Sequence, residues 1–525
     1  KPIEISNEVN ANYIKEHIDA AYYGKAKSNE FDVAVTVGDQ KLSGIKLIEA
    51  MNRYFVTKTL GLNVMTSIAQ LFGGSINTFI NQGTYFNKKD MLDAELKLTS
   101  GKFWGTTEDK KRAALLSFIH PYTEDRTGAK IRHLSVSKAV EYFSSDYLFF
   151  LQRGADSWVN NVVALAMIEN TMVADGNLVN IREFAKKELG HANKFNGTYE
   201  EVKEFDKRLE ARVKELKNSP EALLNYATIN NDQLTLRGIE GSSDTVIRLR
   251  QQILEIIKDA LGNTSHEDLS LYKRSVMWQS FFMFKNWIPR MADKRFGSLK
   301  YAPGTDKYEY GRMRMLVNAV RHLGLASSTS LIAKLGNSPE PLIEVAKQQY
   351  ERKRAEFAEE HQDFDMSEAE FIDMYIKGVR SEIKELLLAA GLMAILIAMR
   401  VNTPDSDEDP EVKGMYRWAL RGLDKLTDEL TFMYTPSSFT SILNGSVFPA
   451  VGILVEFEKF FVSIIKKIFW NIMGDEEQAD KQHVLKHVFR ALPVTKEILT
   501  YIAIFNDDIA KEFGIRMNTN YGSIR

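Results

Sequence analysis

The spacing of hydrophobic and polar positions along this chain is mostly that of helices. Apolar residues recur at intervals of three and four, and only 12 of the 525 residues are proline, so the pattern predicts helix over most of the length. The best strand candidate is the alternating stretch 31–37, which Gly38, Asp39 and the short run 40–42 follow. A glycine-containing turn between two such stretches is typical of a β-hairpin. Beyond Gly44 we predict helix nearly to the end of the chain.

Clusters of glycine, proline and polar residues interrupt this pattern and predict the limits of helical units. We therefore predict an all-α, multidomain protein of helical bundles with a small N-terminal β-hairpin. The predicted units, in chain order, are a segment with the hairpin, a helical domain with an uncharged helix, a second helical domain, and a C-terminal region with long apolar helices. Their limits are 1–50, 51–217, 218–345 and 346–525.

Two of the interruptions contain residues that are typical of helix starts. Residues 218–219 stand before Pro220, as an N-cap stands before a proline at the first helical position. Ser367 and Glu370 have the spacing of a capping box, and the apolar spacing that follows predicts a helix as far as Arg400.

Three stretches carry no charged side chain for longer than a soluble helix normally allows: 59–87, 386–399 and 431–455. The second is fully apolar but shorter than the roughly 20 residues that a membrane-spanning helix needs. The simpler interpretation is that each stretch forms a helix buried on all sides in a helical core. The alternative is a segment covered by protein that later contacts a bilayer. Its candidate residues are Leu60, Phe72, Phe79, Leu386, Leu392, Ile397, Val451 and Phe461.

Overall composition limits the partners and the compartment of the protein. The 68 basic and 70 acidic residues give a net charge of −2, so only a local patch could attract nucleic acid or anionic lipid. A mean hydropathy of −0.26 argues against a resident integral membrane protein. The chain contains no cysteine, which suits a reducing compartment or a protein that must unfold and refold without crosslinks. It begins with Lys1, and we expect a piece of a longer polypeptide.

The common signatures of catalysis are absent from the sequence. There is no G-x-x-x-x-G-K-[ST], G-x-G-x-x-G after a strand, G-x-S-x-G or H-E-x-x-H motif, which counts against the usual NTPases, dehydrogenases, hydrolases and metalloproteases. His483 and His487 are four residues apart, as zinc ligands on one helical face are, but only Glu477 and Asp480 lie near them. We therefore predict no enzymatic activity, no metal site and no cofactor.

The segment 286–314 is the strongest candidate for a local positive field. Between Lys285 and Arg314 eight residues are basic and three are acidic, with aromatic residues interleaved. Aromatic rings beside cations are what single-stranded nucleic acid prefers. The candidate contact residues are Trp287, Arg290, Lys294, Arg295, Arg312 and Arg314.

An internal role for the same segment is the competing interpretation. Pro289 would bend a helix there, and Gly297 would help the chain to turn back. Arg290 and Arg295 would then clamp the turn through ion pairs, for which the guanidinium group is suited. The acids predicted to accept these pairs are Asp293, Asp306 and Glu309.

Two segments resemble parts of known proteins. They are NWIPRMADKRFGSLKYAPGTDKYEYGRMR at 286–314 and LGLNVMTSIAQLFGGSINTFINQGTYFNKKDMLDAEL at 60–96. Both are similar to segments of the very large virion proteins of crAss-like and related short-tailed bacteriophages of Bacteroidetes. The residues that carry the first resemblance are Trp287, Pro289, Arg290, Arg295, Phe296, Gly297, Tyr310, Gly311 and Arg312. The similarity covers a minor part of the chain.

The resemblance implies a cargo protein that is packaged in the portal, tail or capsid and ejected into the host with the genome. It implies a location inside the virion and then in the host envelope or cytoplasm. The implied partners are portal, tail tube or muzzle-type proteins, with genomic DNA and the host membrane as further candidates. Ejected cargo could help the genome to cross the host envelope.

Two alternatives stay open beside the role of ejected cargo. One is a nucleic-acid-binding module of a co-delivered virion RNA polymerase, although the chain lacks the aspartate-rich metal loop that such a polymerase needs. The other is a structural plug or lining of the portal and tail channel.

Overall fold

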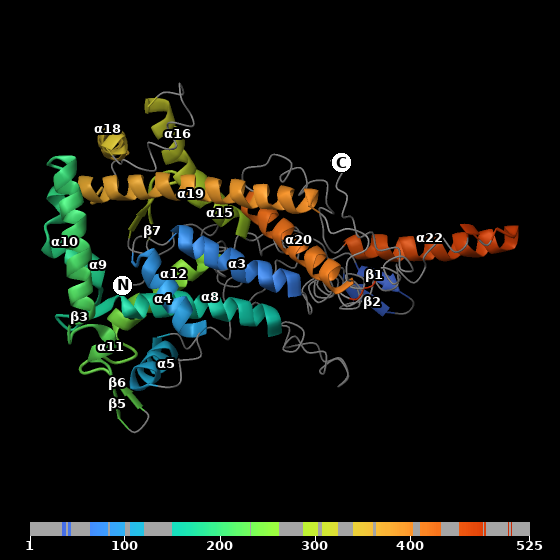
Figure 1. Ribbon diagram of the computed structural model, residues 1–525, viewed down its shortest axis with the longest axis horizontal. Coiled ribbons are helices and arrows are strands. Elements are labelled where there is room, and N and C mark those ends of the chain that lie inside the picture. Colours follow the sequence, from blue (N-terminus) through green and yellow to red (C-terminus); the bar gives the residue numbers. More distant parts are fainter. Residues whose placement is uncertain are drawn as a thin grey trace.

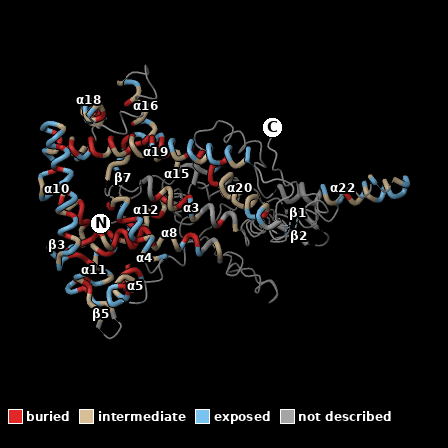
Figure 2. The backbone as a smooth tube through the Cα atoms, in the orientation of Figure 1, coloured by how far each residue is buried: buried red, intermediate tan, exposed pale blue. Residues whose placement is uncertain are grey.

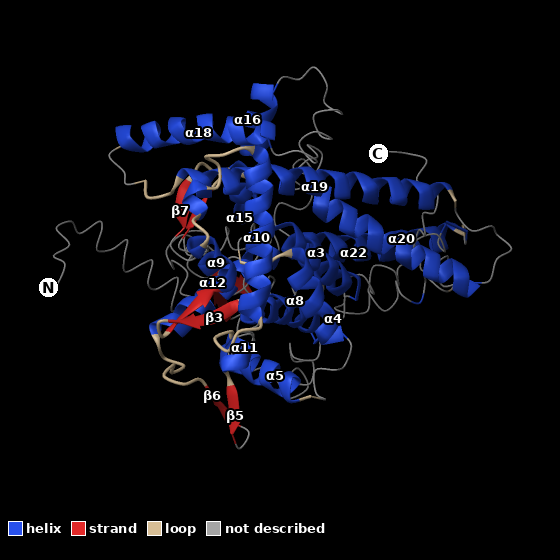
Figure 3. Ribbon diagram, turned by 60° about the vertical axis from the view of Figure 1, so that its left-hand side comes forward, coloured by secondary structure: helices blue, strands red, loops and turns tan. Residues whose placement is uncertain are grey.

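In the computed structural model most of the described chain is helical, and its strands form four two-stranded hairpins (Figures 1 and 3). This agrees with the predicted all-α class. The structure describes residues 34–37, 40–43, 64–81, 85–99, 106–119, 150–230, 233–261, 287–302, 307–323, 340–360, 364–402, 410–431, 451–475, 477–478, 502 and 506.

The elements up to residue 261 are β1 (Ala34–Val37), β2 (Gln40–Ser43), α3 (Val64–Asn81), α4 (Lys88–Thr99), α5 (Thr107–Ile119), α8 (Phe150–Glu169), β3 (Thr171–Ala174), β4 (Asn177–Asn180), α9 (Ile181–Glu188), the 3-10 helix η3 (His191–Asn193), α10 (Tyr199–Lys217), α11 (Leu223–Tyr226), β5 (Thr228–Asn230), β6 (Gln233–Thr235) and α12 (Asp244–Leu261). The later elements are α15 (Trp287–Phe296), β7 (Lys300–Ala302), β8 (Lys307–Glu309), α16 (Arg312–Leu323), α18 (Glu340–Glu359), α19 (Glu368–Val401), α20 (Pro410–Thr431) and α22 (Val451–Met473).

The hairpins are the main departure from the predicted run of helices. Strand β1 pairs antiparallel with β2, with Ala34 opposite Ser43, where the sequence predicts a hairpin. The prediction of helix nearly to the end beyond Gly44 is wrong at the other three hairpins, β3–β4, β5–β6 and β7–β8. In the first of these, Asp175 and Gly176 have φ angles of 50° and 75°. Two consecutive positive φ values are what a type I′ hairpin turn requires.

The largest apolar core surrounds α8. Helices α3, α4, α5, α11 and α12 all contact it, and its residues from Val162 to Ile168 are buried on every face (Figure 2). The same core extends along the chain from Tyr85 to Ile257. It therefore includes residues on both sides of position 217, where the sequence predicts a boundary.

A second core lies between α19, the long helix that crosses Figure 1 above α3 and α8, and the helices α16 and α18, which lie on its other side in that view. It contains Phe371 and Tyr375 of α19, Met315 of α16 and Val345 of α18, and the Tyr375 hydroxyl donates to the Met315 carbonyl oxygen at 2.8 Å. A third, smaller core lies between α9 and α10. The second core also crosses a predicted boundary, because it joins residues before and after position 345.

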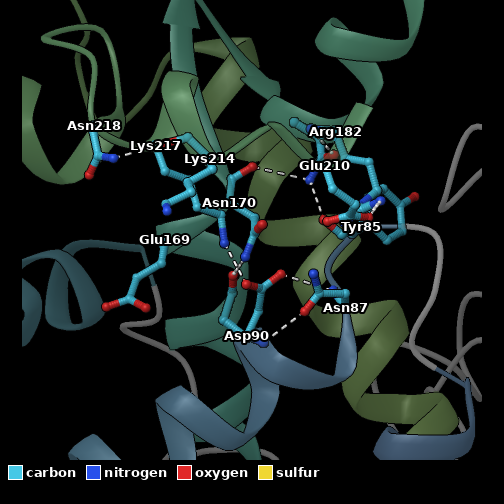
Figure 4. A network of polar contacts seen from close by, with 12 residues as sticks. Tyr85, Asn87, Asp90, Glu169, Asn170, Arg182, Glu210, Lys214, Lys217 and Asn218 are labelled. Carbon is cyan, nitrogen blue, oxygen red and sulfur yellow. Dashed lines mark hydrogen bonds and ion pairs between the residues drawn. The ribbon is translucent and has the colours of Figure 1, made fainter. Parts of the chain in front are cut away.

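Polar contacts connect helices α4, α9 and α10 near the start of α4 (Figure 4). Asp90 accepts a hydrogen bond from the backbone N–H of Asn87 at 2.9 Å and an ion pair from Lys217 of α10 at 2.5 Å. Arg182 of α9 donates to both carboxylate oxygens of Glu210 of α10, at 2.7 and 3.1 Å. Helix α10 is thereby fixed to α4 and to α9 by side chains far apart in the sequence.

The two predicted helix starts have opposite outcomes. The capping box of Ser367 and Glu370 is confirmed, and α19 extends one residue beyond the predicted Arg400. The predicted start at 218–219 is wrong, because Asn218 is instead the C-cap of α10 and its side chain donates to the carbonyl oxygen of Lys214 at 3.0 Å.

Candidate functional site

The segment 286–314, called the cationic segment below, folds back on itself through α15, the β7–β8 hairpin and α16 (Figure 1). Pro289 lies in the first turn of α15, and its predicted bend in a preceding helix lies outside the described residues. Gly311 donates its backbone N–H to the carbonyl oxygen of Gly297 at 3.1 Å. A Cβ atom at Gly311 would lie 2.7 Å from the carbonyl oxygens of Arg295 and Gly297. Glycine is therefore required where the two parts of the turn meet.

The first cations of this segment bind acids of α12. Arg290 forms ion pairs with Glu255 at 2.8 Å and Asp259 at 2.6 Å. Lys294 forms ion pairs with Asp259 at 3.0 Å and Glu309 at 2.5 Å. Arg290 thus has partners outside the segment, which is a correction to the prediction that acids of the segment itself would bind it.

The second pair of cations is buried against α19. Arg295 is 1% exposed, and Glu382 and Glu385 are 0% and 1% exposed. Arg295 forms an ion pair with Glu385, and Arg312 contacts Glu385 at 3.0 Å and Glu382 at 3.4 Å. Burial raises the pKa of the Glu385 carboxyl although both guanidinium groups oppose this. Two arginines and two glutamates thus balance in charge inside the protein.

The predicted acid partners of the turn have other roles. Asp293 forms an ion pair with Lys300, Glu309 binds Lys294, and Asp306 lies outside the described residues. The clamp predicted from the sequence therefore has the cations that we expected but different acids. Those acids belong to α12 and α19, so the segment is fixed to both elements.

This pairing weakens the case for nucleic acid at the segment. Arg290, Lys294, Arg295 and Arg312 all lie against carboxylates, which reduces the field that a phosphate backbone would meet. Arg314 is exposed on α16. The side chain of Trp287 lies outside the described residues.

A second charged cluster centres on Asp373 of α19. Its carboxylate accepts from Lys186 of α9 at 2.9 Å, from His191 of η3 at 2.8 Å and from Lys194 at 2.9 Å. Burial would raise the pKa of Asp373, but the His191 hydrogen bond and the nearby lysines hold the pKa well below its usual range. One buried carboxylate thus joins α9 and η3 to α19. The sequence gives no sign of this cluster, because Asp373 is about 180 residues from His191 and Lys194.

Lys377 lies one turn further along α19. Burial, with a smaller contribution from the positive charge of Lys186, lowers the pKa of Lys377 to about 7 against the attraction of Asp373. Arg182 and Lys194 act in the same direction as Lys186. The surroundings of Asp373 therefore carry more positive than negative charge.

The apolar half of α19 has the opposite character. Leu387, Ile395 and Ile397 are 57%, 51% and 60% exposed, whereas Leu386 and Leu392 are half-buried. The prediction that the stretch 386–399 is buried on all sides is therefore wrong. Helices α20 and α3 contact α19, but they leave one face of this half uncovered.

Helix α22 also presents apolar residues to solvent. It projects beyond the rest of the molecule (Figures 1 and 2), with Phe461, Ile465, Ile468 and Ile472 all exposed. The side chain of Val451, at its first position, lies outside the described residues. These exposed residues lie beyond the uncharged stretch 431–455, and the side chains of the part of that stretch within α22 lie outside the described residues.

Helix α3 is partly buried, unlike the exposed apolar faces of α19 and α22. Its buried positions include Gly73, Gly74 and Thr78, and it packs against α8 and α12. Phe72 is exposed. Among the side chains of α3 that the structure describes, the buried positions carry small residues. Leu60 and the side chain of Phe79 lie outside the described residues.

The part of the chain that the structure describes contains no helix long and apolar enough to span a membrane. Within the same residues no cluster of histidine and carboxylate side chains could hold a metal ion. His483 and His487 lie outside them. No family model, curated protein or solved structure matches the chain.

Proposed function

We propose that this chain is a cargo protein of a short-tailed bacteriophage virion, with no enzymatic role, that binds the surface of the host membrane after ejection. In this proposal it is packaged in the portal, tail or capsid beside portal, tail tube or muzzle-type proteins. It then reaches the host envelope or cytoplasm with the genome. The resemblance of the segments 286–314 and 60–96 supports the virion origin.

The observation that carries the membrane role is the exposed face of α22. Phe461, Ile465, Ile468 and Ile472 follow one another at intervals of four, three and four, which places them on one side of the helix. All four are exposed. An uncovered apolar face of this length marks an interaction surface rather than ordinary surface composition.

The charges of α22 suit an anionic bilayer surface. Lys459 and Lys466 are exposed, and Lys467 is next to them, whereas no acidic residue occurs between Lys459 and Gly474. Lysines beside an apolar face can keep their ammonium groups at the headgroups while the face enters the acyl boundary. Trp470 on the same helix is of a residue type that prefers this interface.

Vesicle flotation with the full chain tests this role. We expect the protein to float with vesicles of phosphatidylcholine mixed with phosphatidylglycerol, and less with phosphatidylcholine alone. The double variant Ile465→Glu/Ile468→Glu should lose binding to both. Lys466→Gln/Lys467→Gln should weaken binding about 30-fold on the anionic vesicles only, since a lysine near such a surface contributes about 1 kcal/mol.

A matched control uses an exposed apolar residue elsewhere. Leu96 on α4 is 65% exposed, and Leu96→Glu should leave flotation unchanged. Failure of the wild-type chain to float with anionic vesicles would contradict the proposal. So would flotation that survives Ile465→Glu/Ile468→Glu.

A further inference from the structure

The uncovered face of α19 has the spacing of a coiled-coil seam. Leu387, Gly391, Ala394, Ala398 and Val401 are all exposed and lie at intervals of four, three, four and three. Such a repeat keeps one stripe of a helix facing a partner helix. Three of the five residues are small, and a Cβ atom at Gly391 would meet nothing within 4 Å. Large side chains of another helix therefore have room at the centre of this seam.

The exposed stripe of α22 is complementary in size. Its seam residues Phe461, Ile465, Ile468 and Ile472 are large, and Ile472 is 78% exposed. The α19 seam is about 21 Å long and that of α22 about 16 Å at the helical rise of about 1.5 Å per residue. The large side chains of α22 extend over a length that fits within the seam of small residues on α19. The large side chains would then act as knobs in holes formed by four residues of the facing helix.

We propose that the apolar half of α19 receives α22 of a second copy of this chain, and that two copies exchange this helix reciprocally. Helix α22 projects beyond the end of α19 in its own chain (Figures 1 and 2), so a second copy can supply it without refolding. Reciprocal exchange makes the same contact twice about a two-fold axis, which closes the assembly at a dimer.

The pairing goes beyond the proposed membrane binding, because it gives α19 a partner and does not require lipid. It also has a consequence for that binding. The seam of α22 would be covered in the dimer and available to a bilayer after the copies separate. Lipid and the second copy therefore compete for one face.

Cross-linking between two single-cysteine chains tests the pairing, and the absence of native cysteine makes it specific. Full chains with Ala394→Cys and chains with Ile468→Cys are mixed and treated with a short bis-maleimide. We expect a cross-linked heterodimer of one chain of each kind. The control mixture of Leu96→Cys with Ile468→Cys should give none. Cross-linking no stronger than in this control overturns the proposal.

The double variant Ala394→Cys/Ile468→Cys distinguishes the two sources of α22. If it closes only within one chain while the mixture of single variants gives no heterodimer, α19 receives its own α22. That result also overturns the proposal of a second copy.

A substitution on α19 separates this proposal from lipid binding. Ala394 is exposed, and glutamate is a good helix former, so Ala394→Glu should fold normally. Sedimentation velocity should show a dimer for the wild-type chain and for Leu96→Glu, and a monomer for Ala394→Glu. Vesicle flotation by Ala394→Glu should persist. A wild-type monomer at every concentration, or a dimer that survives Ala394→Glu, contradicts the pairing whatever the result with lipid.

Discussion

The two halves of α19 show the opposite burial to what their composition predicts. The N-terminal half is rich in charge, yet Asp373, Glu382 and Glu385 within it are buried. The C-terminal half has no charge before Arg400, yet large apolar side chains such as Ile397 are exposed. A single continuous helix thus buries three acids in one half and exposes large apolar side chains in the other.

The difference shows that burial follows the partners that other elements supply. The acids of the charged half meet cations from α9, α15 and α16, so each charge loses water and gains a counter-charge. The apolar residues 162–168 of α8 are buried because five helices contact that helix. The apolar half of α19 lacks such a shell, and its uncovered face therefore marks a surface for a partner.

The largest effect is expected in the charged half. Glu385→Leu would leave Arg295 and Arg312 in the interior with only Glu382 as an acid, and breaking a buried pair in this way costs about 3–5 kcal/mol. Urea unfolding should show that loss in the free energy of unfolding. The double variant Arg295→Met/Glu385→Leu removes one charge of each sign and should recover most of it. A single variant as stable as wild type would mean that these charges are hydrated in solution.

The sequence predicted the parts of α19 that depend on neighbouring residues. The capping box of Ser367 and Glu370 sets the first turn through hydrogen bonds over three residues, and local patterns of this kind can be read directly. The β3–β4 hairpin could have been found in the same way, because Asp175-Gly176 between two short apolar stretches is a strong hairpin signal. Each strand of that hairpin is only four residues long.

The partners of the cationic segment could not be predicted in this way. Arg295 binds an acid that is 90 residues away, and Arg312 binds the same acid from a distance of 73 residues. Which acid meets a cation depends on how α15, α16 and α19 pack, and their apolar faces allow several arrangements. The exposure of α22 is equally a property of packing, because its composition is that of a core helix.

A smaller effect concerns the pH dependence of the charged half. Burial lowers the pKa of Lys377 to about 7 from its ordinary value of 10.5. Below pH 7 both folded and unfolded states are protonated, and the folded state carries the full cost. Between pH 7 and 10.5 the unfolded state binds more protons, so stability rises with pH. Lys377→Met should therefore be more stable than wild type by about 1–3 kcal/mol at pH 6.

The control for Lys377→Met is the pH profile itself. Chemical unfolding of both proteins should give a difference that shrinks as the pH rises above about 7 and disappears above 10.5, where the side chain is mostly neutral in both states. A difference of constant size over the whole range would show that the methionine acts through packing. In that case the ammonium group of Lys377 is not buried among like charges.

The smallest effect is expected in the apolar half, and a matched pair of isoleucines on one helix measures it. Ile397 is 60% exposed and Ile383 is 5% exposed. Ile383→Ser should reduce the free energy of unfolding by about 2–4 kcal/mol, because it leaves a cavity and a polar group in the core. Ile397→Ser should change it by less than about 0.5 kcal/mol in dilute protein, as substitutions on an uncovered surface do. Equal losses for the two variants would mean that both halves of α19 are buried, and the contrast between them would fail.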